Sequence, residues 1–155
     1  MIRYTVNSRT SLLNMPFYVT SLTVTENTCN EDILTILDLS SFKLLRSVVI
    51  GDHCFKYTLV FSIEGLNWLE SVTISSSSFT EDCDDYAIQG SRFRIMNCPI
   101  LKSLSIGRCS FSQYNGFELA QLPQLQTISF SEHTGWYISF GGATEAVFKG
   151  EDECD

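Results

Sequence analysis

The chain has 155 residues, of which 44% are hydrophobic and 18% are charged, so it is long enough to bury a sizeable core as one folded domain. Its formal net charge of −8 argues against nucleic-acid binding, because contacts with phosphate need clustered Lys and Arg. The sequence also contains no apolar run approaching the ~20 residues of a membrane span.

One sequence pattern recurs along the chain. After residues 1–18, which we interpret as a partial N-terminal coil or cap, a weak copy, VTSLTVTENTC, begins at Val19. Closer copies are LRSVVIGDHCF from Leu45, LESVTISSSSF from Leu69, LKSLSIGRCSF from Leu101 and LQTISFSEHTG from Leu125. The starts are 26, 24, 32 and 24 residues apart, and self-similarity at such a period is typical of solenoids, in which each repeat is one coil.

The copies also end alike. Apolar residues recur eight, six and three positions before the next start, in the sets Leu37/Leu39/Phe42, Phe61/Ile63/Leu66, Phe93/Ile95/Cys98 and Phe117/Leu119/Leu122. The 32-residue copy obeys the same rule, so we interpret its surplus over 24 residues as an insertion at about 80–90, around TEDCDDYAIQG.

This pattern resembles the leucine-rich repeat family, whose signature is L-x-x-L-x-L-x-x-N-x-L, over roughly residues 19–140. The apolar positions of the signature are filled by Leu101, Leu104, Ile106 and Phe111, by Leu45, Val48, Ile50 and Phe55, and by Leu69, Val72, Ile74 and Phe79. The residue pattern of these copies is similar to that of divergent repeats in many-copy proteins of single-celled eukaryotes. The chain departs from the signature at the Asn position. This departure implies a looser ladder of the side chains that tie each turn to the neighbouring backbone. The residues at this position are Asn27, His53, Ser77, Cys109 and His133.

The resemblance implies a right-handed solenoid of about five coils, starting near 19, 45, 69, 101 and 125, within residues 19–142. Because the residues between the two apolar segments of each copy have neither the room nor the periodicity of a long helix, we expect a mostly β solenoid rather than an α/β horseshoe. Positions 0, 3 and 5 of each copy should point inward from short strands that stack into a parallel concave sheet. The alternating segments 61–63, 93–95 and 117–119 predict short strands on the opposite wall, with little helix. A Phe column of Phe55, Phe79 and Phe111, with Trp136 one place late, should be buried. Residues 143–155 would form a short last strand, at 143–148, and an acidic tail.

The outward positions of the predicted sheet hold mostly small hydroxyl residues, namely Ser21, Ser47, Ser71, Ser103 and Thr127, then Thr23, Val49, Thr73, Ser105 and Ser129. In one interpretation these hydroxyls bond to each other across neighbouring strands. In the other they form a neutral surface that binds a protein partner, with a mixed-charge rim supplying specificity. The candidate partner-binding residues are Arg46, Val49, Asp52, Glu70, Thr73, Lys102, Ser105, Arg108, Gln126 and Glu132.

We identify no catalytic, cofactor-binding or metal-binding residues. His53 and His133 fall in one column three copies apart, on the order of 14 Å at ~4.8 Å per strand, so they cannot share a zinc ion and are interpreted as turn residues. The acidic cluster EDCDD at 81–85 lacks the spaced oxygen ligands of a calcium loop and is interpreted as a solvated loop. No nucleophile elbow, phosphate-binding Gly loop or H-E-x-x-H motif is present, so we do not expect an enzyme.

The six cysteines show no disulfide-scaffold or zinc-knuckle spacing, which favours an intracellular, cytoplasmic setting. Cys29, Cys98 and Cys109 are interpreted as buried thiols, whereas Cys54, beside a core position, could be reachable. Two functions remain: a non-enzymatic module that binds a protein partner through the concave sheet, and a structural spacer or fragment of a longer repeat array.

Overall fold

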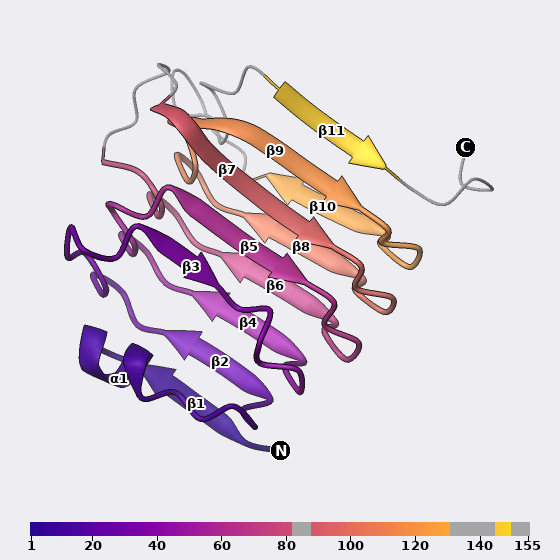
Figure 1. Ribbon diagram of the computed structural model, residues 1–155, viewed down its shortest axis with the longest axis horizontal. Coiled ribbons are helices and arrows are strands. Elements are labelled where there is room, and N and C mark those ends of the chain that lie inside the picture. Colours follow the sequence, from indigo (N-terminus) through magenta and orange to yellow (C-terminus); the bar gives the residue numbers. More distant parts are fainter. Residues whose placement is uncertain (82–87, 131–144, 150–155) are drawn as a thin grey trace.

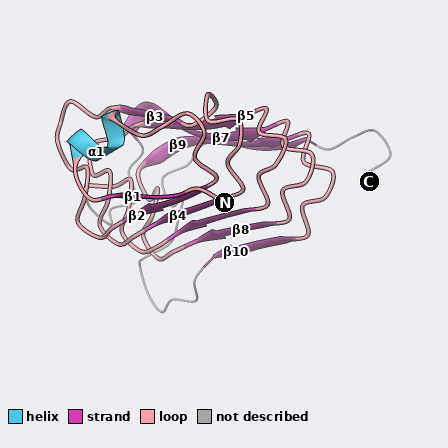
Figure 2. Cartoon of the chain, turned by 90° about the horizontal axis from the view of Figure 1, so that it is seen from below, coloured by secondary structure: helices cyan, strands magenta, loops and turns pink. Residues whose placement is uncertain are grey.

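The computed structural model describes residues 1–81 and 88–130 and the backbone of 145–149. These residues form two parallel sheets and one short helix (Figure 1). The sheets lie as two layers, and from the second strand onward successive strands alternate between them (Figure 2). The predicted mostly β fold with parallel sheets and little helix is confirmed.

The six-stranded sheet is built from strands of four residues each. In sheet order they are β1 (Arg3–Val6), β2 (Ser21–Val24), β4 (Ser47–Ile50), β6 (Ser71–Ile74), β8 (Ser103–Ile106) and β10 (Thr127–Phe130). Equivalent positions of the repeats pair in register, so that Leu22, Val48, Val72 and Leu104 form one line and Val24, Ile50, Ile74 and Ile106 another. All eight side chains are buried, as expected for the inward positions.

The five-stranded sheet consists, in sheet order, of β3 (Ile36–Asp38), β5 (Val60–Glu64), β7 (Ile88–Met96), β9 (Tyr114–Ala120) and β11 (Glu145–Lys149). The strands expected at 61–63, 93–95 and 117–119 lie within β5, β7 and β9. β7 begins at Ile88, inside the expected insertion, and its pairing with β9 shifts register between Ile88 and Arg92. Residues 82–87 of the insertion lie outside the described residues. β11 begins two residues after the predicted start and pairs with β9.

Aromatic rings form two stacks between the sheets. Phe55, Phe79 and Phe111 stack with centroid distances of 5.1 and 4.6 Å. Phe61 and Phe93, from the other sheet, stack at 5.2 Å, and Phe93 meets Phe111 edge-on at 4.9 Å. Burial of each Phe contributes roughly 1.5–3 kcal/mol, and the stacked geometry adds to it. The predicted Phe column is therefore confirmed for its described members; Trp136 lies outside the described residues.

The turns after the strands of the six-stranded sheet share an unusual backbone. After β2, β4, β6 and β8, two residues separated by one other residue have positive φ, namely Asn27/Cys29, His53/Phe55, Ser77/Phe79 and Cys109/Phe111. The first member of each pair occupies the Asn position of the family signature. Such a left-handed residue turns the chain sharply, and the next residue then points toward the neighbouring repeat.

A ladder of side-chain bonds runs through that next residue rather than through the predicted position. The Cys54 thiol and the Ser78 hydroxyl contact the carbonyls of Thr25 and Gly51, at 3.0 and 2.7 Å. The backbone N–H of Cys54 in turn donates to the Ser78 hydroxyl at 3.1 Å. The side-chain bonds that tie these turns to the preceding repeat therefore lie one position after the Asn position of the signature.

Residues 1–18 add a strand and a helix. β1 pairs with β2 along its whole length, one strand before the first recognised copy of the repeat. The helix α1 (Arg9–Leu13) begins with a capping box in which the Ser8 side chain accepts from the N–H of Ser11. The Tyr4 hydroxyl donates to the carbonyl of Ser11 at 2.7 Å, which ties α1 to β1 (Figure 1).

Candidate functional site

The outward face of the six-stranded sheet carries the candidate partner-binding residues. Its strand positions from β2 to β10 hold Ser, Thr and one Val, so none of them can ionise. The hydroxyls of Ser21 and Ser47 are hydrogen-bonded at 3.0 Å, which is the cross-strand bonding expected of this column. The middle of the sheet is consequently a neutral surface of small side chains.

Three of the candidate residues lie next to each other in the middle of this face. Val49 pairs in register with Thr73, and Thr73 pairs with Ser105. Val49 is 39% exposed, and the other two side chains are partly exposed. Because adjacent strands are ~4.8 Å apart, a single extended partner segment could contact all three.

Four candidates precede the strands and are also brought together. The backbone N–H groups of Glu70, Lys102 and Gln126 donate to the carbonyls of Arg46, Glu70 and Lys102, at 2.8, 2.9 and 2.9 Å. All four side chains are exposed. The Arg46 guanidinium lies 5.8 Å from the ring centroid of Trp68, so this cation extends over the neighbouring turn.

Two candidates lie beyond the opposite ends of the strands. Asp52 is exposed, but its carboxylate accepts from the backbone N–H of Ser76 at 2.8 Å, which gives it a role in holding the turn. Arg108 is exposed, and its carbonyl accepts from the N–H of Ser77 at 2.8 Å. The remaining candidate, Glu132, lies outside the described residues.

Sequence reasoning missed the contribution of β1 to this face. Arg3 pairs in register with Ser21, and Thr5 with Thr23, so both extend the outward columns by one strand. The exposed Arg3 therefore places a cation on the edge strand β1, beside the neutral surface of the sheet. The alternation of Tyr4 and Val6, which both point to the interior, was the signal that could have found this strand.

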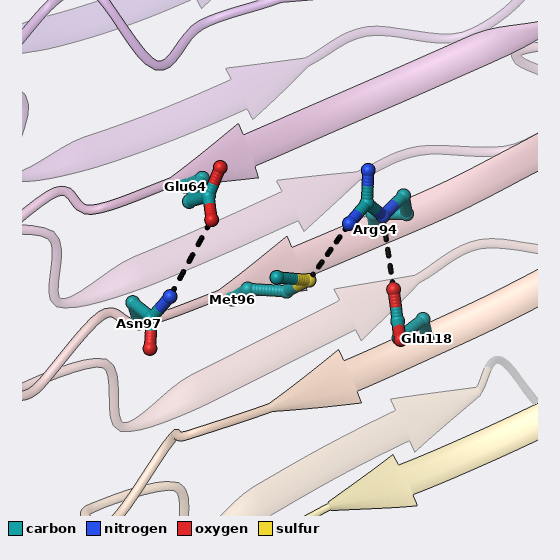
Figure 3. A network of polar contacts seen from close by, with 5 residues as sticks. All are labelled: Glu64, Arg94, Met96, Asn97 and Glu118. Atoms are coloured by element: carbon teal, nitrogen blue, oxygen red, sulfur yellow. Dashed lines mark hydrogen bonds and ion pairs between the residues drawn. The ribbon is translucent and has the colours of Figure 1, made fainter.

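The outward face of the five-stranded sheet has a different chemistry. Arg94 forms an ion pair with Glu118 at 2.9 Å and also donates to the sulfur of Met96 at 3.2 Å (Figure 3). Asn97 donates to Glu64 at 3.5 Å in the same network (Figure 3). Since the Arg94 and Glu118 side chains are 35% and 28% exposed, solvent screens their attraction and the pair adds little stability.

A polar depression of about 400 Å³ lies beside the left-handed turns. It is lined by Asn27, Asn30, His53, Lys56, Ser77, Thr80 and Glu81. The Asn30 side chain bonds both the carbonyl of His53 and the N–H of Lys56, at 2.9 Å each, so it braces the next turn. His53 is a turn residue, as predicted, whereas His133 lies outside the described residues. Within residues 1–81 and 88–130, no group of three or more His, Cys, Asp or Glu side chains could hold a metal ion.

The cysteines differ from expectation at two positions. Cys54 is fully buried and burial raises the pKa of its thiol, so it is not the reachable cysteine that the sequence suggested. Cys109 is disulfide-bonded, so its interpretation as a buried thiol is wrong. Cys29 and Cys98 are free and buried, as expected, and burial, followed by Glu31 and Cys54, raises the pKa of Cys29 to about 12.

Comparison with family models, with curated proteins and with solved structures finds no match to this chain. Across the part of the chain that the structure describes, none of the helices has the length and apolar character needed to cross a membrane.

Proposed function

We propose that this chain is a non-enzymatic interaction module that binds a protein partner through its six-stranded sheet. In this proposal the repeats are leucine-rich-repeat-like and form a right-handed solenoid of about five coils whose concave wall is that sheet. The in-register pairing of Ser47, Ser71 and Ser103 supports it, because every strand then presents the same positions to one surface.

The distribution of charge on the sheet is the observation that carries the proposal. The outward positions of β2, β4, β6, β8 and β10 lack ionisable side chains, whereas Arg46, Glu70 and Lys102 lie at one end of these strands and Asp52 and Arg108 at the other. A neutral centre inside a charged rim is the usual composition of a protein interface, because uncharged groups cost less to desolvate.

A photo-cross-linking experiment tests the proposal. A benzophenone amino acid at Thr73 is compared with the same label at Ser62, which lies in the other sheet and is also partly exposed. In an extract of the source cells, we expect the Thr73 label to capture a discrete protein and the Ser62 label to leave it uncaptured. The substitution Val49→Asp should abolish capture, because it adds an unpaired charge to the neutral surface.

The rival function is a structural spacer, in which the hydroxyl columns serve only to bond neighbouring strands, as Ser21 and Ser47 do. This rival predicts no difference in capture between the Thr73 and Ser62 labels. That outcome, or capture that survives the Val49→Asp substitution, would refute binding through the sheet.

A further inference from the structure

The disulfide of Cys109 leaves two candidates for its partner. The chain has six cysteines, and Cys109 is disulfide-bonded. The cysteines that carry free thiols are Cys29, Cys54 and Cys98. Within this chain the partner is therefore Cys83 or Cys154, which both lie outside the described residues. The described backbone around Cys109 decides which of the two can reach it.

The segment that precedes Cys83 lies against the repeat that contains Cys109. Four contacts hold residues 77–81 beside residues 108–113, namely the Ser77 N–H to the Arg108 carbonyl at 2.8 Å, the Phe79–Phe111 stack at 4.6 Å, the Thr80 and Ser112 hydroxyls at 2.9 Å, and the Glu81 N–H to the Gln113 side-chain oxygen at 3.1 Å. The two segments are therefore in register, and the last of these contacts is two residues before Cys83.

Cys83 is within reach of Cys109 from this position. The N–H of Ser112 donates to the carbonyl of Cys109 at 3.1 Å, which closes a turn whose ends are less than about 7 Å apart. Glu81 is held beside Gln113, the residue that follows this turn. Two extended residues span ~7 Å, and a disulfide joins Cα atoms up to ~6.8 Å apart.

Cys154 follows a strand that ends on the opposite side of the molecule. β11 ends at Lys149, which pairs with Ala120 at the end of β9, whereas Cys109 precedes the start of β9 (Figure 1). β9 runs from Tyr114 to Ala120, which is ~20 Å at ~3.3 Å per residue. The five residues from Lys149 to Cys154 span at most ~18 Å, so they would have to run straight back along the whole strand. The geometry therefore favours Cys83.

We propose that Cys83 and Cys109 are a site of oxidative cross-linking, which ties the acidic segment EDCDD at 81–85 to the left-handed turn of the next repeat. When the bond forms, the two thiols lose two protons and two electrons to a small-molecule disulfide, which is released as two thiols. The bond closes a loop from Cys83 to Cys109, so it restricts the unfolded chain and stabilises the fold.

The charges around Cys83 predict which thiols reduce this bond. Four carboxylates lie within two residues of Cys83 in the sequence, namely Glu81, Asp82, Asp84 and Asp85. They repel an anionic thiol such as glutathione and attract a cationic one such as cysteamine. Cys109 is only 3% exposed, so the attacking thiol has little access from that side. The rate of reduction should therefore depend on the charge of the thiol.

Peptide mapping of the intact chain by mass spectrometry tests the pairing. After free thiols are blocked, trypsin separates the three cysteines into peptides 57–92, 109–149 and 150–155. We expect 57–92 to be linked to 109–149. A link between 109–149 and 150–155, a disulfide-linked dimer, or no link at all would overturn the proposal.

Two further measurements test what the bond does. Excess dithiothreitol should lower the Tm by about 5–15 °C, and Cys83→Ser should abolish this dependence, whereas the matched control Cys154→Ser should keep it. The opposite result for the two variants would refute the pairing.

At low salt and equal thiolate concentration, cysteamine should reduce the bond at least about threefold faster than glutathione, and 1 M salt should remove most of the difference. Equal rates at low salt would contradict the role of the acidic segment.

Discussion

The hydroxyl of Ser110 accepts a hydrogen bond from the backbone N–H of Ser78 at 3.0 Å, across two successive repeats. The Ser78 hydroxyl does the same for Cys54 at 3.1 Å and also donates to the carbonyl of Gly51 at 2.7 Å. A single hydroxyl thus satisfies two backbone groups of the preceding repeat. The turns are held together by this ladder as well as by the strands.

The first prediction concerns this ladder. Ser78→Ala leaves the N–H of Cys54 and the carbonyl of Gly51 without their partner in a buried region, so it should lower the free energy of unfolding by about 2–4 kcal/mol. The control, Ser76→Ala, removes a partly exposed hydroxyl two residues away and should cost less than about 0.5 kcal/mol. Urea denaturation measures both, and equal losses would refute the ladder.

The second prediction concerns the packing of successive repeats. A Cβ on Gly107 would lie 2.5 Å from the backbone carbon of Ser75, closer than real contacts allow, so Gly107→Ala should lower the free energy of unfolding by at least about 2 kcal/mol. Gly116 is the matched control, because its added Cβ would approach other atoms no closer than 3.6 Å. Thermal unfolding should show a lower Tm for Gly107→Ala and little change for Gly116→Ala; the reverse order would contradict the close approach.

The third prediction concerns the aromatic stacks. Phe79 lies between Phe55 and Phe111 and also meets Phe61 edge-on at 5.2 Å, so Phe79→Ala should cost about 3–5 kcal/mol. Phe17→Ala, at a side chain 74% exposed, should leave stability within about 0.5 kcal/mol of the unchanged protein. Urea denaturation measures the free energy of unfolding of both variants. A loss of less than about 1 kcal/mol for Phe79→Ala would contradict a shared interior.

The fourth prediction is a dependence of stability on pH. The folded pKa of Cys29, about 12, exceeds its ordinary value of 9.0, so the unfolded chain loses this proton first as the pH rises. The stability that the buried neutral thiol contributes is complete below about pH 9 and is lost progressively toward pH 12. Burial also raises the pKa of the Tyr114 hydroxyl, which adds to the loss at the alkaline end.

Cys29→Ala removes one of these titrating groups. Between pH 9 and 12 its free energy of unfolding should fall less steeply than that of the unchanged protein, as measured by urea denaturation at a series of pH values. If the free energy of unfolding of both proteins fell with the same slope, Cys29 would have the same pKa in the folded and the unfolded chain, which would contradict the prediction.

The period of the repeats was sufficient to predict the parallel strands and their inward residues. Leu45, Leu69 and Leu101 are each fully buried, because a side chain that is apolar in every copy can only be accommodated in a shared interior. The strands of the second sheet were found for the same reason, through the alternation around Phe61 and Phe93.

Features without a repeated apolar signal were missed or misplaced. β1 has no repeat start of its own in front of it, so the strand from Arg3 was not recognised. The ladder was assigned one residue early, because a left-handed residue such as Ser77 reverses which neighbour points inward, and no hydrophobic pattern records φ.

The most direct test of the whole account is whether equivalent residues of successive repeats touch in order. In protein with ¹³C-labelled Val and Leu methyl groups, we expect nuclear Overhauser effects between Val48 and Val72 and between Val72 and Leu104, which pair in register. Val48 and Leu104 are two strands apart, roughly twice ~4.8 Å, and should show a much weaker effect or none. The absence of a Val48–Val72 effect, or a strong effect between Val48 and Leu104, would contradict the stacking on which the proposed binding surface depends.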